Sequence, residues 1–367
     1  PTRRSSDLTI NMKYYLLIFH LILCNTLKVD PSEYTYEPNS NRNLVSNNDD
    51  SKKNLIIAVI SNCDWNNMAI FFKSYEKAHF ENTDLIIFAN KLKGKAKEKM
   101  KSYATEIYPI PDEYTKISTE NSRWKIYSDF LNKNKNLYNQ VFTTDIKTTF
   151  FQKDIFKYYD NKKSFLGISL EDGFISLDEN TKKIIIDSYG EEIFKTMKKK
   201  RIINVSTILG TINKFIELSN LMWDKINSEL SKGNEINSKA VINYIIYHDK
   251  ILSDSIIFSD NRDGPIMSLG LANRALIILD ENKNVLNIEG KIAYVVNQYD
   301  KQDDIFDIAI NKYCPGLYTL RGNPFENYIF VVILFVGTIA FSFLLGSLYI
   351  YRFQDIIREN NKNNKCK

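Results

Sequence analysis

The feature that most constrains the fold is an alternation of apolar runs with segments of helical periodicity. Residues 54–60 (NLIIAVI) and 84–89 (DLIIFA) are continuous apolar runs that end at polar residues. Such runs are typical of strands that are buried on both faces, as in parallel sheets. The predicted order is strand 54–60, helix 65–79, strand 84–89, helix 91–103 and strand 105–108.

The same rhythm continues through the second half of the chain. The predicted elements are helix 120–131, strand 140–143, an amphipathic segment at 150–158, strand 164–170, a glycine-ended segment at 202–210, helices 212–230 and 239–248, and strands 255–258 and 292–296. Strands that alternate with helices favour an α/β fold of the Rossmann-like kind, built on a mostly parallel sheet.

Length and composition describe a globular protein. The chain has 367 residues, of which 44% are hydrophobic and 25% are charged. Its net charge of +5 is spread over a large chain, so we expect no nucleic-acid partner. The longest basic run, residues 195–201 (KTMKKKR), is interpreted as a solvated helix end, and a phosphate-binding patch is the alternative.

The N-terminal part predicts entry into the secretory pathway. Residues 12–25 begin with Met and one Lys and continue as an apolar run too short to span a bilayer, which is typical of a signal peptide. Residues 1–11 do not fit a signal peptide, and we interpret them as non-native. Residues 26–53 are rich in Asn, Ser and Asp and are predicted to be a disordered linker.

The C-terminal part predicts a membrane anchor. Residues 328–351 form an uncharged, apolar run that is long enough to cross the hydrocarbon core, and basic residues follow in 352–367. The positive-inside bias places 352–367 in the cytosol. We therefore predict a single-pass type I membrane protein of the ER, Golgi or cell surface. In that oxidising compartment Cys63 and Cys314 either pair or stay free.

One carboxylate stands out within the predicted domain at 54–320. The strand 140–143 stops just before Asp145, and open α/β sheets bind ligands beyond the carboxyl ends of their strands. The alternative is that Asp145 only begins a turn, since Asp commonly ends strands.

Several segments in chain order resemble nucleotide-diphospho-sugar glycosyltransferases of the GT-A type. Residues 145–156 (DIKTTFFQKDIF) resemble the motif Asp-x-Arg-Asp, an apolar pair and Phe-Gln-x-Asp-x-Phe of one subgroup. Further similar segments are Arg123-Trp124, residues 204–210, Gly264-Pro265 with Leu269-Gly270, and residues 297–301. The resemblance implies a GT-A domain that moves a hexose from a nucleotide-sugar, with UDP as one option, to a glycan or glycoprotein.

The resemblance also implies roles for individual residues. Asp145 would bind Mn²⁺ or Mg²⁺, which prefer oxygen ligands, or would contact the ribose. Glu171 or Asp172 would act as the acceptor base, with a plain turn as the alternative. Arg123 would hold phosphate, unless it is an ordinary surface arginine. The other residues assigned to nucleotide-sugar binding are Ser61, Asn62, Asp64, Lys147, Gly210, Asn297 and Gln298. For Gly210, the alternative is a turn glycine.

The chain departs from the subgroup at positions that carry chemistry. Thr148 replaces the second acidic residue, Lys147 adds a positive charge, Asn297 replaces a His, and Ser238-Lys239 replaces an Asp-Gln pair. Two interpretations stay open. One is a transferase that depends little on metal, with the Lys147 ammonium partly in its place, and the other is an inactive protein that binds nucleotide-sugar or glycan. An adhesion or receptor protein would have more strand sequence and more cysteines.

Overall fold

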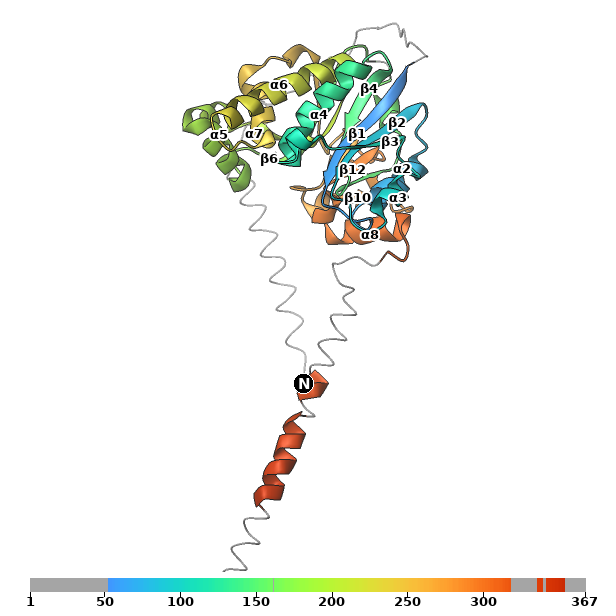
Figure 1. Ribbon diagram of the computed structural model, residues 1–367, viewed down its shortest axis with the longest axis vertical. Helices are drawn as coiled ribbons and strands as arrows, with labels where there is room; N and C mark the ends of the chain where they lie inside the picture. Colours follow the sequence, from blue (N-terminus) through green and yellow to red (C-terminus); the bar gives the residue numbers. More distant parts are fainter. Residues whose placement is uncertain (1–51, 161, 318–334, 339–340, 354–367) are drawn as a thin grey trace, which may run out of the picture. The chain divides into compact units, whose positions relative to one another are not determined.

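The structure is a computed structural model that describes residues 52–160, 162–317, 335–338 and 341–353 (Figure 1). The predicted signal peptide, residues 1–11 before it and nearly all of the predicted linker lie outside the described residues. Most of the predicted cytosolic tail also lies outside them. The folded domain described below is a mixed α/β unit.

The described domain is built on a seven-stranded sheet with the order β3-β2-β1-β4-β7-β6-β8. Its strands are β1 (Lys53–Ser61), β2 (Thr83–Asn90), β3 (Glu106–Pro109), β4 (Tyr138–Thr143), β6 (Leu166–Phe174), β7 (Arg201–Thr211) and β8 (Ile256–Ser259). All neighbouring pairs are parallel except those of β7, which runs antiparallel to both β4 and β6. The mostly parallel sheet is compatible with the predicted Rossmann-like fold.

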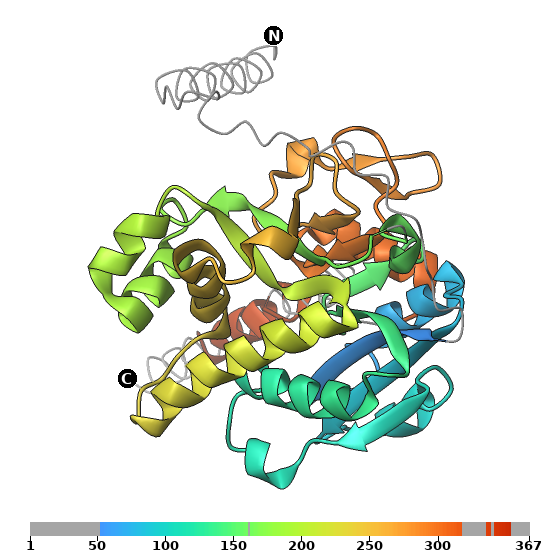
Figure 2. The ribbon, with the colours of Figure 1, turned by 90° about the horizontal axis from the view of Figure 1, so that it is seen from above.

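Helices cover both faces of this sheet (Figure 1; Figure 2). The side chains of β1 alternate between the faces, so that Leu55 and Ile57 belong to one core and Ile56 and Ala58 to the other. The first core is completed by α4 (Thr119–Asn134), α6 (Ile212–Ser231) and α7 (Ser238–Asn243), and the second by α2 (Ala69–Ala78) and α3 (Ala96–Met100). Both faces are therefore buried, as the continuous apolar runs predict.

A three-stranded sheet with the order β5-β12-β9 adjoins the second core. It consists of β5 (Thr149–Phe151), β9 (Ile266–Ser268) and β12 (Val295–Asn297), and α8 (Asp303–Tyr313) packs on it. A short hairpin of β10 (Ile278–Leu279) and β11 (Val285–Leu286) lies near it in sequence. The chain passes from the large sheet into the small one directly after β4, through residues 144–148.

Several predicted boundaries were wrong. The strand predicted at 164–170 continues to Phe174, so Glu171 and Asp172 lie inside β6 and not in a turn after it. The amphipathic segment at 150–158 divides into β5 and a 3₁₀ turn, Ile155–Tyr158. The helix predicted at 239–248 ends as α7 at Asn243 and continues as a π-helical turn, Tyr244–Asp249. Helix α5 (Glu179–Met197) was not predicted, and neither was α8.

The predicted membrane span at 328–351 lies partly outside the described residues. Within the part of the chain that the structure describes, one helix, Phe335–Phe353, is long and apolar enough to cross a membrane. Its 19 residues correspond to about 28 Å of helix, close to the thickness of a hydrocarbon core. By length and composition, it is compatible with a single-pass membrane protein. Cys63 and Cys314, whose pairing the sequence left open, are both free thiols.

Phe151 is the centre of the aromatic contacts that join the two sheets. Its ring lies 5.2 Å from that of Phe71, 5.0 Å from Phe80 and 6.2 Å from Phe142, and the residue is fully buried. We expect Phe151→Ala to lower the free energy of unfolding by about 3–5 kcal/mol, because it leaves a cavity in a packed core. Urea unfolding of the detergent-solubilised chain, followed by circular dichroism, measures this.

The control is Leu177→Ala, since Leu177 is 73% exposed and its truncation should change the unfolding free energy by less than about 0.5 kcal/mol. Equal effects of the two substitutions would contradict the placement of Phe151.

Candidate functional site

The order of the strands marks where a ligand is expected. From β1 the chain builds outward through β2 and β3, and then returns to place β4 on the other side of β1. Such a reversal leaves a crevice beyond the carboxyl ends of the two adjacent strands, where open α/β sheets bind their ligands. Here those ends are Ser61 of β1 and the residues that follow Thr143 of β4.

A cavity of about 150 Å³ occupies this position, and we call it the switch cavity. Its lining is mostly polar and comes from the end of β1, the first turns of α4 and the segment after β4. The lining residues are Val59, Ile60, Ser61, Thr119, Glu120, Arg123, Asp145 and Lys147. Four residues that the sequence assigned to nucleotide-sugar binding, Ser61, Arg123, Asp145 and Lys147, therefore lie together.

Asp145 is held in a tight turn. Its Oδ1 accepts a hydrogen bond of 2.9 Å from the backbone N–H of Lys147, and its carbonyl accepts one of 3.3 Å from Thr148. The hydroxyl of Tyr299 donates to the Lys147 carbonyl at 3.2 Å and ties this turn to the residues after β12. A turn of this kind is what an Asp after a strand favours. Asp145 therefore both forms this turn and lines the switch cavity.

Arg123 and Lys147 bring positive charge to the switch cavity. Arg123 lies on α4, where its Nε donates to the Glu120 carbonyl at 3.1 Å. Its terminal nitrogens have no hydrogen-bond partner among the described residues, and neither does the Lys147 ammonium. In the same part of the chain, no carboxylate lies within 4 Å of either cation as an ion pair. The Arg123 guanidinium also lies over the Trp124 ring, 6.0 Å from its centroid. Cations that form no ion pair beside a polar cavity are suited to bind an anionic ligand.

A second cavity of about 300 Å³, the Glu171 cavity, shares Glu120, Arg123 and Asp145 with the first. It extends from the turn after β4 across β6 and β7 to the segment after β12. Its remaining lining residues are Thr148, Glu171, Asn180, Ile184, Asn204, Val205, Ser206, Asn237, Lys239, Gln298, Asp300 and Lys301. The two cavities adjoin at these three shared residues, and we refer to the two cavities together as the cleft.

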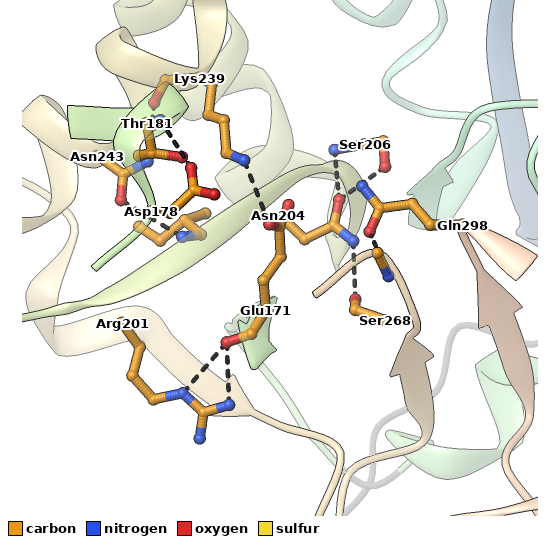
Figure 3. Close-up of polar contacts among 12 residues, drawn as sticks. Glu171, Asp178, Thr181, Arg201, Asn204, Ser206, Lys239, Asn243, Ser268 and Gln298 are labelled. Carbon is orange, nitrogen blue, oxygen red and sulfur yellow. Dashed lines mark hydrogen bonds and ion pairs between the residues drawn. The ribbon is translucent and has the colours of Figure 1, made fainter. Parts of the chain in front are cut away.

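Glu171 is the most deeply buried carboxylate that lines this cleft, with 3% of its surface exposed. Its Oε2 accepts a hydrogen bond of 3.2 Å from the Lys239 ammonium, as Figure 3 shows. Burial raises the pKa of the Glu171 carboxyl above its ordinary value, while Lys239 and a hydrogen bond from Gln298 act in the opposite direction. A carboxylate with a raised pKa that lines a cleft is a candidate proton acceptor.

Gln298 is positioned by a close backbone contact. Its Oε1 accepts a hydrogen bond of 3.1 Å from the Gly270 N–H. A Cβ on residue 270 would lie 2.1 Å from that Oε1, so only glycine allows this approach. Gln298 itself has the left-handed φ of 57°. Leu269-Gly270 and residues 297–301, which the sequence analysis singled out separately, therefore contact each other through Gly270 and Gln298.

A buried polar network lies beneath the cleft and joins the two sheets (Figure 3). Asn204 of β7 donates through Nδ2 to Ser268 Oγ at 2.7 Å and to Asn297 Oδ1 at 2.8 Å. Ser206 Oγ donates to Asn204 Oδ1 at 2.6 Å, and Asn297 Nδ2 donates to Thr149 Oγ1 at 2.8 Å. Asn297 has no exposed surface. It therefore supports the cleft from below and is not among the residues that line it.

Two other predicted residues are also outside the cleft. Asp172 accepts hydrogen bonds of 2.8 Å from Arg201 and 2.7 Å from Asn261, and lines neither cavity. Gly210 pairs with Val141 in the middle of β4 and with Leu166, the first residue of β6, because β7 is antiparallel to both strands. It lines neither cavity. The sequence assigned Gly210 to nucleotide-sugar binding or to a turn, and the structure places it inside β7, two residues before α6.

Asn62 and Asp64 follow β1 but line neither cavity among the described residues. Asp64 Oδ1 accepts a hydrogen bond of 3.1 Å from the Asn67 N–H ahead of α2, and the Asn62 N–H donates to the Asn90 carbonyl. Both residues close the loop after β1. Of the three predicted residues at the end of β1, which are Ser61, Asn62 and Asp64, only Ser61 lines the described cleft.

The carboxylates of the cleft do not form a metal-binding cluster. Within the described ranges, no three His, Cys, Asp or Glu residues are arranged to hold a metal ion. Asp145 is flanked by Lys147 and by Arg123 across the cavity, and Glu171 is already paired with Lys239. Mn²⁺ and Mg²⁺ favour converging oxygen ligands, so this donor set does not fit the predicted metal.

Lys239 is the main residue whose role sequence reasoning missed. It was noted only as a departure, with Ser238-Lys239 in place of an Asp-Gln pair. A local signal was Asn237, which caps α7 by accepting a hydrogen bond of 2.8 Å from the Lys239 N–H and so marks where the helix begins. The partner, Glu171, is too distant in sequence for the pairing to be read from the chain.

A scan of protein-family models and a search of curated proteins found no match to this chain. The function is therefore inferred from the geometry of the cleft.

Asn297 offers a direct test of the network. We expect Asn297→Ala to lower the free energy of unfolding by about 1–3 kcal/mol or more, because Asn204 and Thr149 then lose a buried hydrogen-bond partner. Urea unfolding measures the change, and Asn66→Ala, at an exposed position, is the control. An unchanged midpoint for Asn297→Ala would contradict the network.

Proposed function

We propose that the cleft binds a nucleotide-diphospho-sugar and that the protein is a hexosyltransferase with a GT-A-type domain. In this proposal the domain lies in the lumen of the secretory pathway and is held by a single membrane span. The acceptor is a glycan or glycoprotein. The observation that carries the proposal is the cleft at the reversal of strand order, where Arg123, Asp145 and Lys147 adjoin the buried carboxylate of Glu171.

The two cavities suit the two halves of such a reaction. The switch cavity, at the ends of β1 and β4, offers positive charge to a diphosphate. The Glu171 cavity is larger and contiguous, and it leaves room for the sugar and the acceptor. Asp145 and Arg123, at the junction, would lie beside the bond between sugar and diphosphate.

Glu171 is the proposed acceptor base. Its carboxylate would take the proton of the acceptor hydroxyl as that oxygen bonds to the anomeric carbon, while the bond from this carbon to the diphosphate breaks. The raised pKa of Glu171 makes it a stronger base than an exposed carboxylate. Lys239 and Gln298 hold its orientation.

The alternative is an inactive protein that binds nucleotide-sugar or glycan. The observation that favours it is the pairing of Glu171, which is nearly inaccessible and already accepts a hydrogen bond from Lys239. A base engaged in this way has to exchange a partner before it accepts a proton. Binding and turnover therefore need separate measurements.

Nucleotide binding is the first test. We expect UDP to raise the thermal unfolding temperature of the detergent-solubilised full chain, measured with Mn²⁺ and with EDTA, because a ligand that binds the native state stabilises it. Uridine is the control, since it lacks the diphosphate. If UDP and a panel of other nucleoside diphosphates give no shift under either condition, both the transferase and the inactive nucleotide binder are excluded.

Turnover separates the two functions. We expect Glu171→Gln to lower the hydrolysis of UDP-hexoses by about 10²–10⁴-fold, the usual contribution of a general base, while UDP still raises the unfolding temperature. Asp172→Asn is the matched control, since this neighbouring carboxylate lies outside the cleft, and it should keep most of the rate. If the unaltered chain binds UDP but hydrolyses none of the sugars, the inactive binder is favoured.

The rate should also depend on pH through Glu171. Because its pKa is raised, the rate is expected to fall as the pH drops through that value and the carboxylate is protonated. Lys239 lowers this pKa and Asp178 raises it, so Lys239→Met should move the acidic limb of the pH profile to higher pH. Lys232→Met, which removes an ion pair with Glu229 outside the cleft, should leave the limb in place. A shift to lower pH in Lys239→Met would contradict the assignment.

A further inference from the structure

We propose that Arg123 and Lys147 bind the diphosphate directly, with no divalent cation between it and Asp145. This inference rests on the proposed function, because it concerns the same ligand in the same cleft. In the family that the sequence resembles, a metal ion would neutralise the charge of the diphosphate. Here Arg123 and Lys147 would neutralise it.

Four cations and four carboxylates line the cleft, and two pairs are already formed. Lys239 lies 3.2 Å from Glu171, and Lys301 lies 3.7 Å from Asp300. The charges that remain are Arg123, Lys147, Glu120 and Asp145. All four line the switch cavity, where neither cation forms an ion pair with a described carboxylate.

Asp145 is poorly placed to recruit a metal alone. Its Oδ1 already accepts the Lys147 N–H, and Lys147 and Arg123 line the same cavity. A divalent cation at Asp145 would be close to two positive charges, Lys147 and Arg123, which repel it. Glu120 is the other carboxylate that lines this cavity, and no three ligand side chains are grouped to hold a metal among the described residues. A diphosphate in that position is attracted by both cations.

The chemistry of the two side chains fits the two phosphates. Arg123 keeps its terminal nitrogens available, since only its Nε is used within the helix, and a guanidinium fork matches phosphate oxygens. Lys147 provides a mobile point charge from the turn after β4. The first turn of the 16-residue helix α4 also lines the cavity, and the positive end of a helix favours anions.

Calorimetric titration of UDP into the detergent-solubilised full chain tests the proposal. We expect the dissociation constant in EDTA to equal that in Mn²⁺. Arg123→Ala and Lys147→Ala should each weaken binding in EDTA by at least about tenfold, the usual effect of losing a charge-assisted hydrogen bond. Lys133→Ala is the control, because Lys133 is an exposed cation on the same helix as Arg123.

Asp145→Asn distinguishes the two modes of binding. The substitution keeps an oxygen for the Lys147 N–H and removes the negative charge, so binding in EDTA should be unchanged or tighter. Binding that requires Mn²⁺ and disappears in Asp145→Asn would overturn this inference and leave the proposed function standing. Absence of UDP binding in both buffers would overturn both.

Discussion

The arrangement of the cleft depends on one buried amide pair, Asn204 and Asn297. Asn204 belongs to the large sheet and Asn297 to the small one, and their hydrogen bond of 2.8 Å connects the two. Buried amides need partners, and here Ser206, Ser268 and Thr149 supply them. Because such bonds are directional, the network sets the position of one sheet relative to the other more closely than apolar packing does.

The antiparallel strand β7 explains why that network lies under the cleft. A parallel strand in its place would point its carboxyl end, and with it Gly210, at the binding edge. Because β7 runs antiparallel to β4, its first half lies at the binding edge, and Asn204 and Ser206 line the Glu171 cavity. Ile208 and Leu209, which follow, pair with β4. Arg201, at the start of β7, binds the Glu171 carbonyl and the Asp172 carboxylate, which turns Asp172 away from the cleft.

Local patterns were sufficient for the parts of the fold that are buried on both faces. The strands β1 and β2 were predicted close to their observed bounds because their central residues form continuous apolar runs. The strand β4 was predicted two residues short at its start, where Tyr138 and Asn139 precede its apolar centre. The apolar pattern did not predict the bounds of the strands that are buried by residues distant in sequence. The end of β6 includes polar residues and is stabilised by Arg201, and β9 and β12 have three residues each and depend on the network. Asp145 was found from sequence because a strand end is a local signal, and Arg123 was assigned from the resemblance of Arg123-Trp124. The Glu171–Lys239 pair joins residues that are far apart in sequence, so no local signal predicts it.

Lys239 and Lys147 both line the cleft but differ in whether their charge is already paired. Lys239 is engaged with Glu171, and its charge keeps the pKa of that buried carboxyl lower than burial alone would leave it. Lys147 has no such partner among the described residues, so its charge remains available to an anion. In the proposed function, Arg123 and Lys147 would hold the diphosphate, while Lys239 would set the basicity of Glu171. The charge that binds the ligand and the charge that acts on the carboxylate would then belong to different side chains, among eight charged residues that are balanced in number.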